Sequence, residues 1–269
     1  IKDDPDCRFE LGLLYSELAG AHLGQGRNVE SQPLFYQGKA IYEQLVSEFP
    51  QDPTYREELA WALFMEANRV EQPDDAVKAC RRALEINEQL AKEAPTAPAY
   101  HNGVAYCYHR MGIFLKRAGR RPEAEEAYRQ AADLVERLLA EFPDWAPSDF
   151  GGAFTRTHRD LQWLLVNDGR EKDAERIYLR ALEIYPRLSK SWMKSPENRW
   201  KLAEYRWGLA KLASRYGRME EATRFSAEAL RMYEQVAAEL PKNRAYQNRL
   251  AARKAEIGNF TTRAQPPKD

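Results

Sequence analysis

Cysteine and histidine are scarce in this sequence, which argues against several kinds of site. Its 269 residues include three cysteines and four histidines. Widely spaced cysteines in an odd number support neither a disulfide framework nor a metal knuckle, and buried free thiols are expected instead. His101 and His109 lie about two helical turns apart, too far along a helix to share one metal. No tight cluster of acids, bases or metal ligands is visible, so we expect no metal, no cofactor and no enzyme.

Net charge and long apolar runs are lacking as well. Lysine and arginine total 41, as do aspartate and glutamate, so no global basic field exists to hold nucleic acid. No apolar run is long enough to cross a bilayer and no signal sequence opens the chain, which predicts a cytoplasmic protein. A start at Ile1 rather than methionine fits a piece of a longer polypeptide or a processed product.

What the sequence does contain is an internal repeat of two helices and a turn. The turn motif begins with Gly-Arg in its clearest copies, ends in Ala or Ser, and recurs at intervals of 45 to 50 residues. It occurs five times, at residues 26–31, 71–76, 119–124, 169–174 and 217–222. Glycine suits this turn because it takes left-handed dihedrals at little cost, as helix C-termini commonly need.

Other residues recur in step with the motif. A small residue lies seven positions after each motif ends, at Gly38, Ala83, Ala131, Ala181 and Ala229. A leucine or methionine lies eight positions before each motif begins, at Leu18, Leu63, Met111, Leu161 and Leu209. A proline then closes each unit, at Pro50, Pro95, Pro143, Pro196 and Pro241. Because these spacings fall on one helical face, we predict that the small residues let helices approach closely and that the leucines and methionine form the core.

These residues resemble the tetratricopeptide repeat family. The third repeat matches the family pattern best, with Gly112, Gly119, Ala124, Tyr128 and Ala131. The second helix of each repeat is longer than the family's usual form. In that respect the sequence resembles the repeat arrays attached to large bacterial serine/threonine protein kinases, although no kinase motif is present. The resemblance implies an all-α fold, a right-handed solenoid of five helix pairs plus a C-terminal capping helix.

We expect this solenoid to be a single domain over residues 1–259. Its repeats are expected at about 5–50, 51–95, 96–143, 144–196 and 197–241. The capping helix is expected at 244–259, with a solvated outer face at Arg249, Arg253, Lys254 and Glu256, before a disordered tail at 260–269.

In this family the first helices line a concave groove, and counting back from each turn identifies the matching positions. The predicted partner-binding residues are Trp61, Asn68, Arg69, His109, Lys116, Arg117, Arg159, Trp163, Asn167, Trp207 and Arg215. Aromatic anchors mixed with Arg, Lys and Asn suit an extended, somewhat acidic peptide. A second interpretation stays open, in which the arginines form a solvated face and the tryptophans pack under neighbouring repeats.

The resemblance implies a scaffold or recruitment module that presents this groove to a partner protein or an extended peptide. The alternative is a structural subunit that joins a larger assembly through its outer faces or terminal helices. Neither prediction involves nucleic acid or a membrane span.

Overall fold

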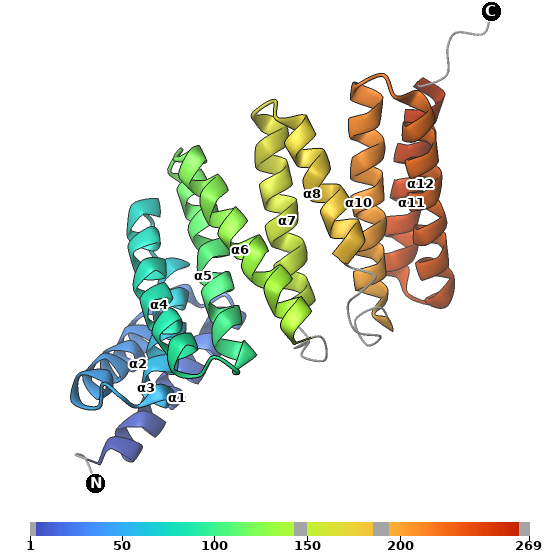
Figure 1. The fold of residues 1–269 in the computed structure, drawn as a ribbon. Coiled ribbons are helices and arrows are strands. Elements are labelled where there is room, and N and C mark those ends of the chain that lie inside the picture. The colour runs from blue at the N-terminus through green and yellow to red at the C-terminus, as the bar shows by residue number, and fades with distance from the viewer. Residues whose placement is uncertain (1–3, 143–149, 185–193, 264–269) are drawn as a thin grey trace, which may run out of the picture. The chain divides into compact units, whose positions relative to one another are not determined.

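The computed structural model describes residues 4–142, 150–184 and 194–263, and all regular structure in these ranges is helical (Figure 1). The helices are α1 Pro5–Gly24, α2 Asn28–Glu48, α3 Pro53–Ala67, α4 Pro73–Glu93, α5 Pro98–Arg117, α6 Arg121–Glu141, α7 Phe150–Asn167, α8 Glu171–Ile184, α10 Pro196–Arg215, α11 Met219–Glu239 and α12 Arg244–Arg263. The predicted all-α fold with helix pairs is confirmed.

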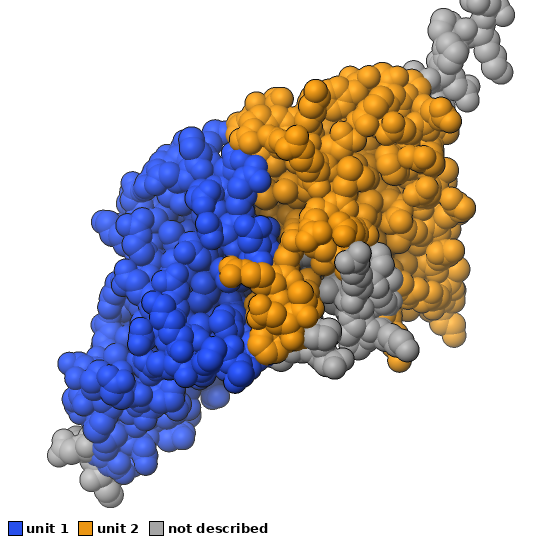
Figure 2. Space-filling view, viewed as in Figure 1, with its two compact units in different colours: residues 1–134 blue, residues 135–269 orange. Residues whose placement is uncertain are grey.

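The chain divides into two compact units, Ile1–Leu134 and Val135–Asp269 (Figure 2). In the first unit, α1 packs on α2, α2 on α3, α3 on α4 and α4 on α5. In the second, α7 packs on α8, α8 on α10, α10 on α11 and α11 on α12. Each of these helices therefore packs mainly on its neighbours in sequence, which is how a stack of helical hairpins buries its apolar faces.

The turns between paired helices follow the predicted motif. Gly26, Gly119, Gly169 and Gly217 all have positive φ, between 70 and 77°. Such backbone ends an α-helix without the penalty that a Cβ would bring. Pro50, Pro95 and Pro241 lie two residues after the ends of α2, α4 and α11, as predicted, but Pro196, predicted to close the fourth repeat, is instead the first residue of α10. This placement is favourable because the first helical position needs no N–H donor.

The predicted core is largely confirmed. All five small residues are buried, and Ala83, Ala131, Ala181 and Ala229 have no exposed surface. Leu63, Met111, Leu161 and Leu209 are also buried. The prediction was wrong for Leu18, whose side chain is 48% exposed, because no described helix packs on that face of α1.

A recurring ion pair holds the ends of three helix pairs together. The fourth residue of the first helix is an arginine, and it pairs with a glutamate that is the last residue of the second helix. The pairs are Arg8 with Glu48, Arg56 with Glu93, and Arg199 with Glu239. We call these three contacts the end clamps. Both terminal nitrogens of each guanidinium, Nη1 and Nη2, donate to the carboxylate, which is the strong, bidentate form of this interaction.

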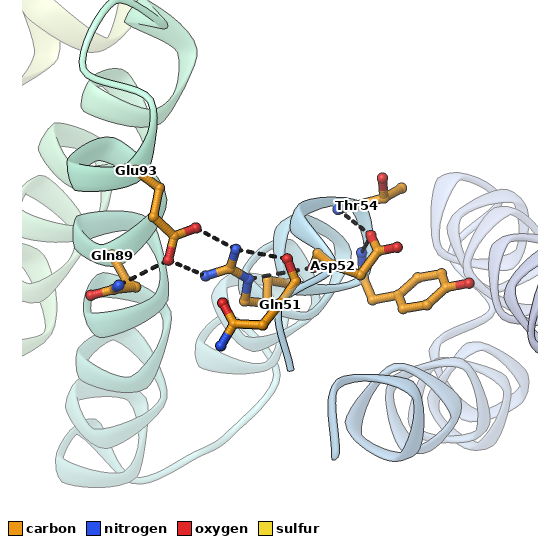
Figure 3. A network of polar contacts seen from close by, with 7 residues as sticks. Gln51, Asp52, Thr54, Gln89 and Glu93 are labelled. Atoms are coloured by element: carbon orange, nitrogen blue, oxygen red, sulfur yellow. Dashed lines mark hydrogen bonds and ion pairs between the residues drawn. The ribbon is translucent and has the colours of Figure 1, made fainter. Parts of the chain in front are cut away.

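The end clamp of the second repeat is the most enclosed (Figure 3). Arg56 is only 7% exposed and donates from Nη1 to Glu93 Oε1 at 3.0 Å. It also donates to the backbone carbonyls of Gln51 and Asp52, at 3.3 Å each. Gln89 donates to the same carboxylate from one turn earlier on α4. The hydrogen bonds that Glu93 accepts lower its pKa to about 2, and those from Arg56 contribute more than the one from Gln89.

The last helix completes the core of the second unit. Trp200, Trp207 and Tyr233 are buried together with Ile257 of α12. The ring of Phe260 meets that of Trp207 edge-on at 5.0 Å. Because α12 continues to Arg263, residues 260–263, predicted to be part of the tail, are helical. Pro143 and the rest of that tail, 264–269, lie outside the described residues.

Candidate functional site

The second unit contains a cleft of about 670 Å³ between its first helices. Helices α7, α10 and α12 provide most of the lining, and Tyr178 of α8 contributes to the wall. Its basic side chains are Arg156, Arg159, Lys201, Lys211, Arg249 and Arg253. Among the lining residues that the structure describes, Glu197 and Glu204 are the acidic ones, so these residues carry a surplus of four positive charges. A cleft lined by one sign of charge concentrates ligands of the opposite sign.

Both glutamates of the cleft are already bonded to arginines of α12. Arg249 donates to Glu197 at 2.7 Å, and Arg253 donates to Glu204 at 2.9 Å. Burial alone would raise the pKa of Glu197, but hydrogen bonds from Arg249 and Tyr246 outweigh it, so this pKa lies below its ordinary value. Glu197 therefore stays ionised, and both carboxylates are already hydrogen-bonded to arginines of α12.

Two cations of the cleft have no carboxylate of their own. Neither Arg156 nor Lys211 forms an ion pair with any residue that the structure describes. The Lys211 ammonium lies 5.4 Å from the centre of the Trp207 ring. Although the Lys211 side chain reaches solvent, the residues around its ammonium partly exclude water, and this desolvation lowers the pKa of Lys211. An ammonium in such surroundings gains from an anionic partner, because the partner offsets the lost hydration.

The structure separates the predicted partner-binding residues into three groups. Those whose side chains are exposed are Trp61, Asn68, Arg117, Arg159, Trp163, Asn167 and Arg215. Arg69 and Lys116 are half-buried, and His109 and Trp207 are buried. Only Arg159 of the predicted set lines the cleft.

Two members of the predicted set cannot contact a partner directly. Trp207 is 1% exposed because α12 covers it, and its Nε1 donates to Glu256 at 3.2 Å. His109 is 3% exposed and its ring lies 5.9 Å from that of Tyr128. For Trp207 the second interpretation, a tryptophan that packs under a neighbouring helix, is the right one.

Exposed Trp61 belongs to an aromatic row in the first unit. Its ring stacks on Phe64 at 5.3 Å, and Phe64 in turn meets Tyr106 at 4.6 Å. The guanidinium of Arg110 lies over the rings of Phe64 and Phe114, at 5.5 and 5.0 Å. Such cation–π contacts orient the cation without neutralising it.

Arg69 is placed in a similar way, above an aromatic ring. Its guanidinium lies 4.1 Å from the ring centre of Phe35 and donates to the carbonyl of Met65. These contacts hold the Arg69 side chain against Phe35 and the backbone of α3, although the sequence predicted that it would face a partner.

Most of the basic residues in the cleft were missed by sequence reasoning. Lys211 could have been found, because it lies six positions before its turn, where the two preceding repeats have Ile113 and Trp163. Arg249 and Arg253 were assigned to a solvated outer face, and that prediction was wrong. They point toward α10 because Glu197 and Glu204 lie there. Pairing between helices cannot be seen in a single-helix pattern.

Other kinds of site find little support in the described parts of the chain. No group of His, Cys, Asp and Glu side chains there could hold a metal ion. None of the described helices is long and apolar enough to cross a membrane. Cys80 and Cys107 are buried as predicted, and burial raises the pKa of the Cys80 thiol to about 12. Cys7 is exposed, contrary to the prediction of buried thiols, because it lies on the uncovered face of α1.

Comparison with known proteins identifies the fold. The tetratricopeptide repeat family model matches residues 104–144. Aspartyl phosphate phosphatase F from Bacillus subtilis is 13% identical, with a TM-score of 0.63 over 95% of this chain and 58% of that one. A putative kinesin light chain of nearly identical repeats from Podosopora anserina is 20% identical, with a TM-score of 0.55 over 90% of this chain and all of that one.

BtubC from P. vanneervenii is 16% identical, with a TM-score of 0.51 over 88% of this chain and 92% of that one. A search of curated protein sequences finds no match. The likeness to kinase-attached arrays stays a prediction. Proteins with this fold generally mediate protein–protein interaction and are generally non-enzymatic scaffolds. The chain thus has the tetratricopeptide-repeat fold, and its residues 104–144 are a tetratricopeptide repeat.

Proposed function

We propose that this chain is a recruitment module that binds an acidic segment of a partner protein in the cleft of its second unit. The observation that carries the proposal is the surplus of four positive charges in that cleft, within a chain whose formal net charge is zero. Because the excess is local, it attracts an acidic ligand to one place and gives no general affinity for polyanions. The fold supports a role in protein interaction.

The chemistry of the cleft favours carboxylates. Arginine donates paired hydrogen bonds that match a carboxylate, and lysine supplies a compact charge. Arg156 and Arg159 come from one helix and Lys211 from another, so a ligand can be held from two sides. Prior pairing of Glu197 and Glu204 keeps them from competing for these cations.

The proposal can be tested with a fluorescein-labelled hexaglutamate peptide, whose binding is followed by fluorescence anisotropy at several salt concentrations. The double variant R156Q/K211Q should weaken binding at least tenfold and reduce its salt dependence, since two charges are lost from the cleft. A matched control, K78Q/R176Q, removes the same charge from two well-exposed positions outside the cleft. Equal weakening by both double variants would reject the cleft as the binding site.

A second candidate, a structural subunit, is favoured by the uncovered face of α1. Leu11, Leu14 and Leu18 recur at helical spacing and are 44, 61 and 48% exposed. Light scattering after size-exclusion chromatography tests this candidate, because a stable oligomer at low concentration that L14E dissociates would favour assembly over recruitment. A monomer at all concentrations would exclude self-assembly through α1.

A further inference from the structure

A row of apolar side chains on α1 is open to solvent, although the matching row of the next repeat is buried. Leu11, Leu14 and Leu18 are 44, 61 and 48% exposed, and exposed Ala21 continues the row. Their spacing of three, four and three residues is that of the seam along which two helices pair side by side. On α3, which packs on α2 as well as on α4, Leu59 occupies the place of Leu14 and is only 5% exposed. The row therefore has the form of a helix-binding surface, and we call it the α1 seam.

Two carboxylates flank the α1 seam on one side. Glu10 and Glu17 are exposed and seven residues apart, a spacing that returns to the same side of a helix. Neither forms a hydrogen bond or an ion pair with any residue that the structure describes. The one arginine of α1, Arg8, is already bonded to Glu48 in an end clamp. The surface beside the leucines is therefore negatively charged.

These carboxylates disfavour the two simplest occupants of the α1 seam. In α3 the corresponding residues, 45 positions on, are Tyr55 and Ala62, which are 8 and 4% exposed. A purely apolar helix packed on α1 in the same way would bury Glu10 and Glu17 without partners, which is strongly unfavourable. A second copy of α1 packed antiparallel would set Glu10 of one chain beside Glu17 of the other, and like charges there oppose pairing. A helix with cations beside its own apolar seam satisfies both carboxylates instead.

The contact between α2 and α3 shows this arrangement inside the chain. Lys39 of α2 donates from Nζ to Oε1 of Glu66 on α3 at 2.8 Å. The two side chains are only 11 and 17% exposed, so the pair is part of the packed interface. A lysine on a covering helix thus neutralises a carboxylate on a first helix.

We infer that the α1 seam binds a basic amphipathic helix of a partner protein, in which apolar residues at the same spacing are flanked by lysines or arginines. From Leu11 to Ala21 the seam is about 15 Å long, so about three turns of the partner helix cover it. The inference goes beyond the proposed function, because it concerns the first unit and a partner segment of opposite charge. It also names an occupant for the face that favours the second candidate function.

Two fluorescein-labelled 21-residue peptides of identical composition test the inference on the full chain. The heptad peptide has leucine at the first and fourth positions of each heptad, lysine at the fifth and seventh, and alanine elsewhere. The scrambled peptide has the same residues in an order that breaks the seam. We expect the heptad peptide to bind at least tenfold more tightly by fluorescence anisotropy.

Charge variants of the chain locate the site. E10Q/E17Q should weaken binding of the heptad peptide at least fivefold and reduce its salt dependence, since two exposed carboxylates are lost. The matched control, E85Q/E220Q, removes two exposed carboxylates on α4 and α11 and should leave the affinity unchanged. Because all four side chains are exposed, both variants should keep the circular dichroism melting curve of the unmodified chain.

The apolar part of the site is tested with L14S/L18S, which should weaken binding of the heptad peptide at least tenfold. Equal affinity for the two peptides, or equal weakening by E10Q/E17Q and E85Q/E220Q, would overturn the inference. So would a dimer of the unmodified chain that L14S/L18S dissociates in light scattering, because a second copy would then cover the seam. None of these results bears on the cleft of the second unit, which is tested separately with hexaglutamate.

Discussion

Gly112 of α5 lies close against Tyr128 of α6 in the third repeat. A Cβ at this position would lie 2.6 Å from the ring of Tyr128, which is fully buried and cannot move aside. The residue is needed for space, because its backbone is an ordinary α-helix.

We predict that G112A destabilises the protein by about 1 to 3 kcal/mol in urea unfolding, the usual cost of overpacking a core. The control is G20A, because a Cβ on Gly20 meets nothing within 4 Å. That substitution should stabilise the chain by about 0.5 to 1 kcal/mol, since alanine is the better helix former. Similar unfolding curves for the two variants would show that Tyr128 leaves room.

The end clamp of Arg56 and Glu93 makes a prediction about pH. Glu93 ordinarily titrates near 4.5 and is lowered to about 2, so its contribution is complete above pH 4.5 and fades as pH falls toward 2. The melting temperature of E93Q should therefore be lower than that of the unmodified chain at pH 7, and the difference should shrink between pH 4.5 and 2. Thermal melts followed by circular dichroism measure both values, and a pH-independent difference would contradict the assignment.

Among the elements, α1 and α3 occupy equivalent places in the first two repeats but differ in what covers them. Leu14 and Leu59 occupy the same place in the first two repeats, 45 residues apart, yet Leu14 is 61% exposed and Leu59 only 5%. The difference comes from packing, because α2 covers α3 and no described helix covers this face of α1.

This contrast predicts very different tolerance of charge. L14E should change the free energy of unfolding by no more than about 0.5 kcal/mol, as surface substitutions do. L59E should cost about 4 kcal/mol or more or prevent folding, because it buries an unpaired carboxylate. Chemical denaturation and soluble yield measure both, and strong destabilisation by L14E would mean that its face is covered.

The end clamps show what a single sequence reveals about an element and what it hides. In hindsight each partner of an end clamp lies in a recognisable sequence motif. The arginine ends Pro-x-x-Arg at the start of the first helix, as from Pro5, and the glutamate begins Glu-x-Pro at the end of the second, as at Glu48. The turns, small residues and most core positions were predictable because they depend on local geometry. The clamps and the inward direction of Arg253 were not, because they depend on which helix packs alongside, and for the same reason the covering of Trp207 stayed one of two interpretations.

For the molecule as a whole, the balance of charges sets its solubility. The sequence has a pI of about 7.1, so net repulsion between copies is least near neutral pH. We predict a solubility minimum near pH 7 in polyethylene glycol precipitation between pH 5 and 9. L14E adds a charge and removes exposed apolar surface, so it should raise solubility at the minimum. A flat profile would show that surface charge does not limit solubility.

At this scale the sequence predicted the kind of fold well, whereas it did not predict the cleft. Repetition of a pattern five times over makes the helix pairs evident, because each copy supports the others. The cleft, in contrast, combines residues of α7, α8, α10 and α12, so it depends on how these helices pack together. Only Arg159 among the predicted partner-binding residues lines it.

The end clamps also bear on how the protein would respond to mechanical force. Each one ties the beginning of a helix pair to that pair's own end, so tension along the chain is first resisted within single pairs. Stretching in optical tweezers should therefore release the first, second and fifth pairs as separate events, each lengthening the tether by one repeat. Disrupting one clamp, as in R56A, should lower the rupture force of its own pair and leave the others unchanged.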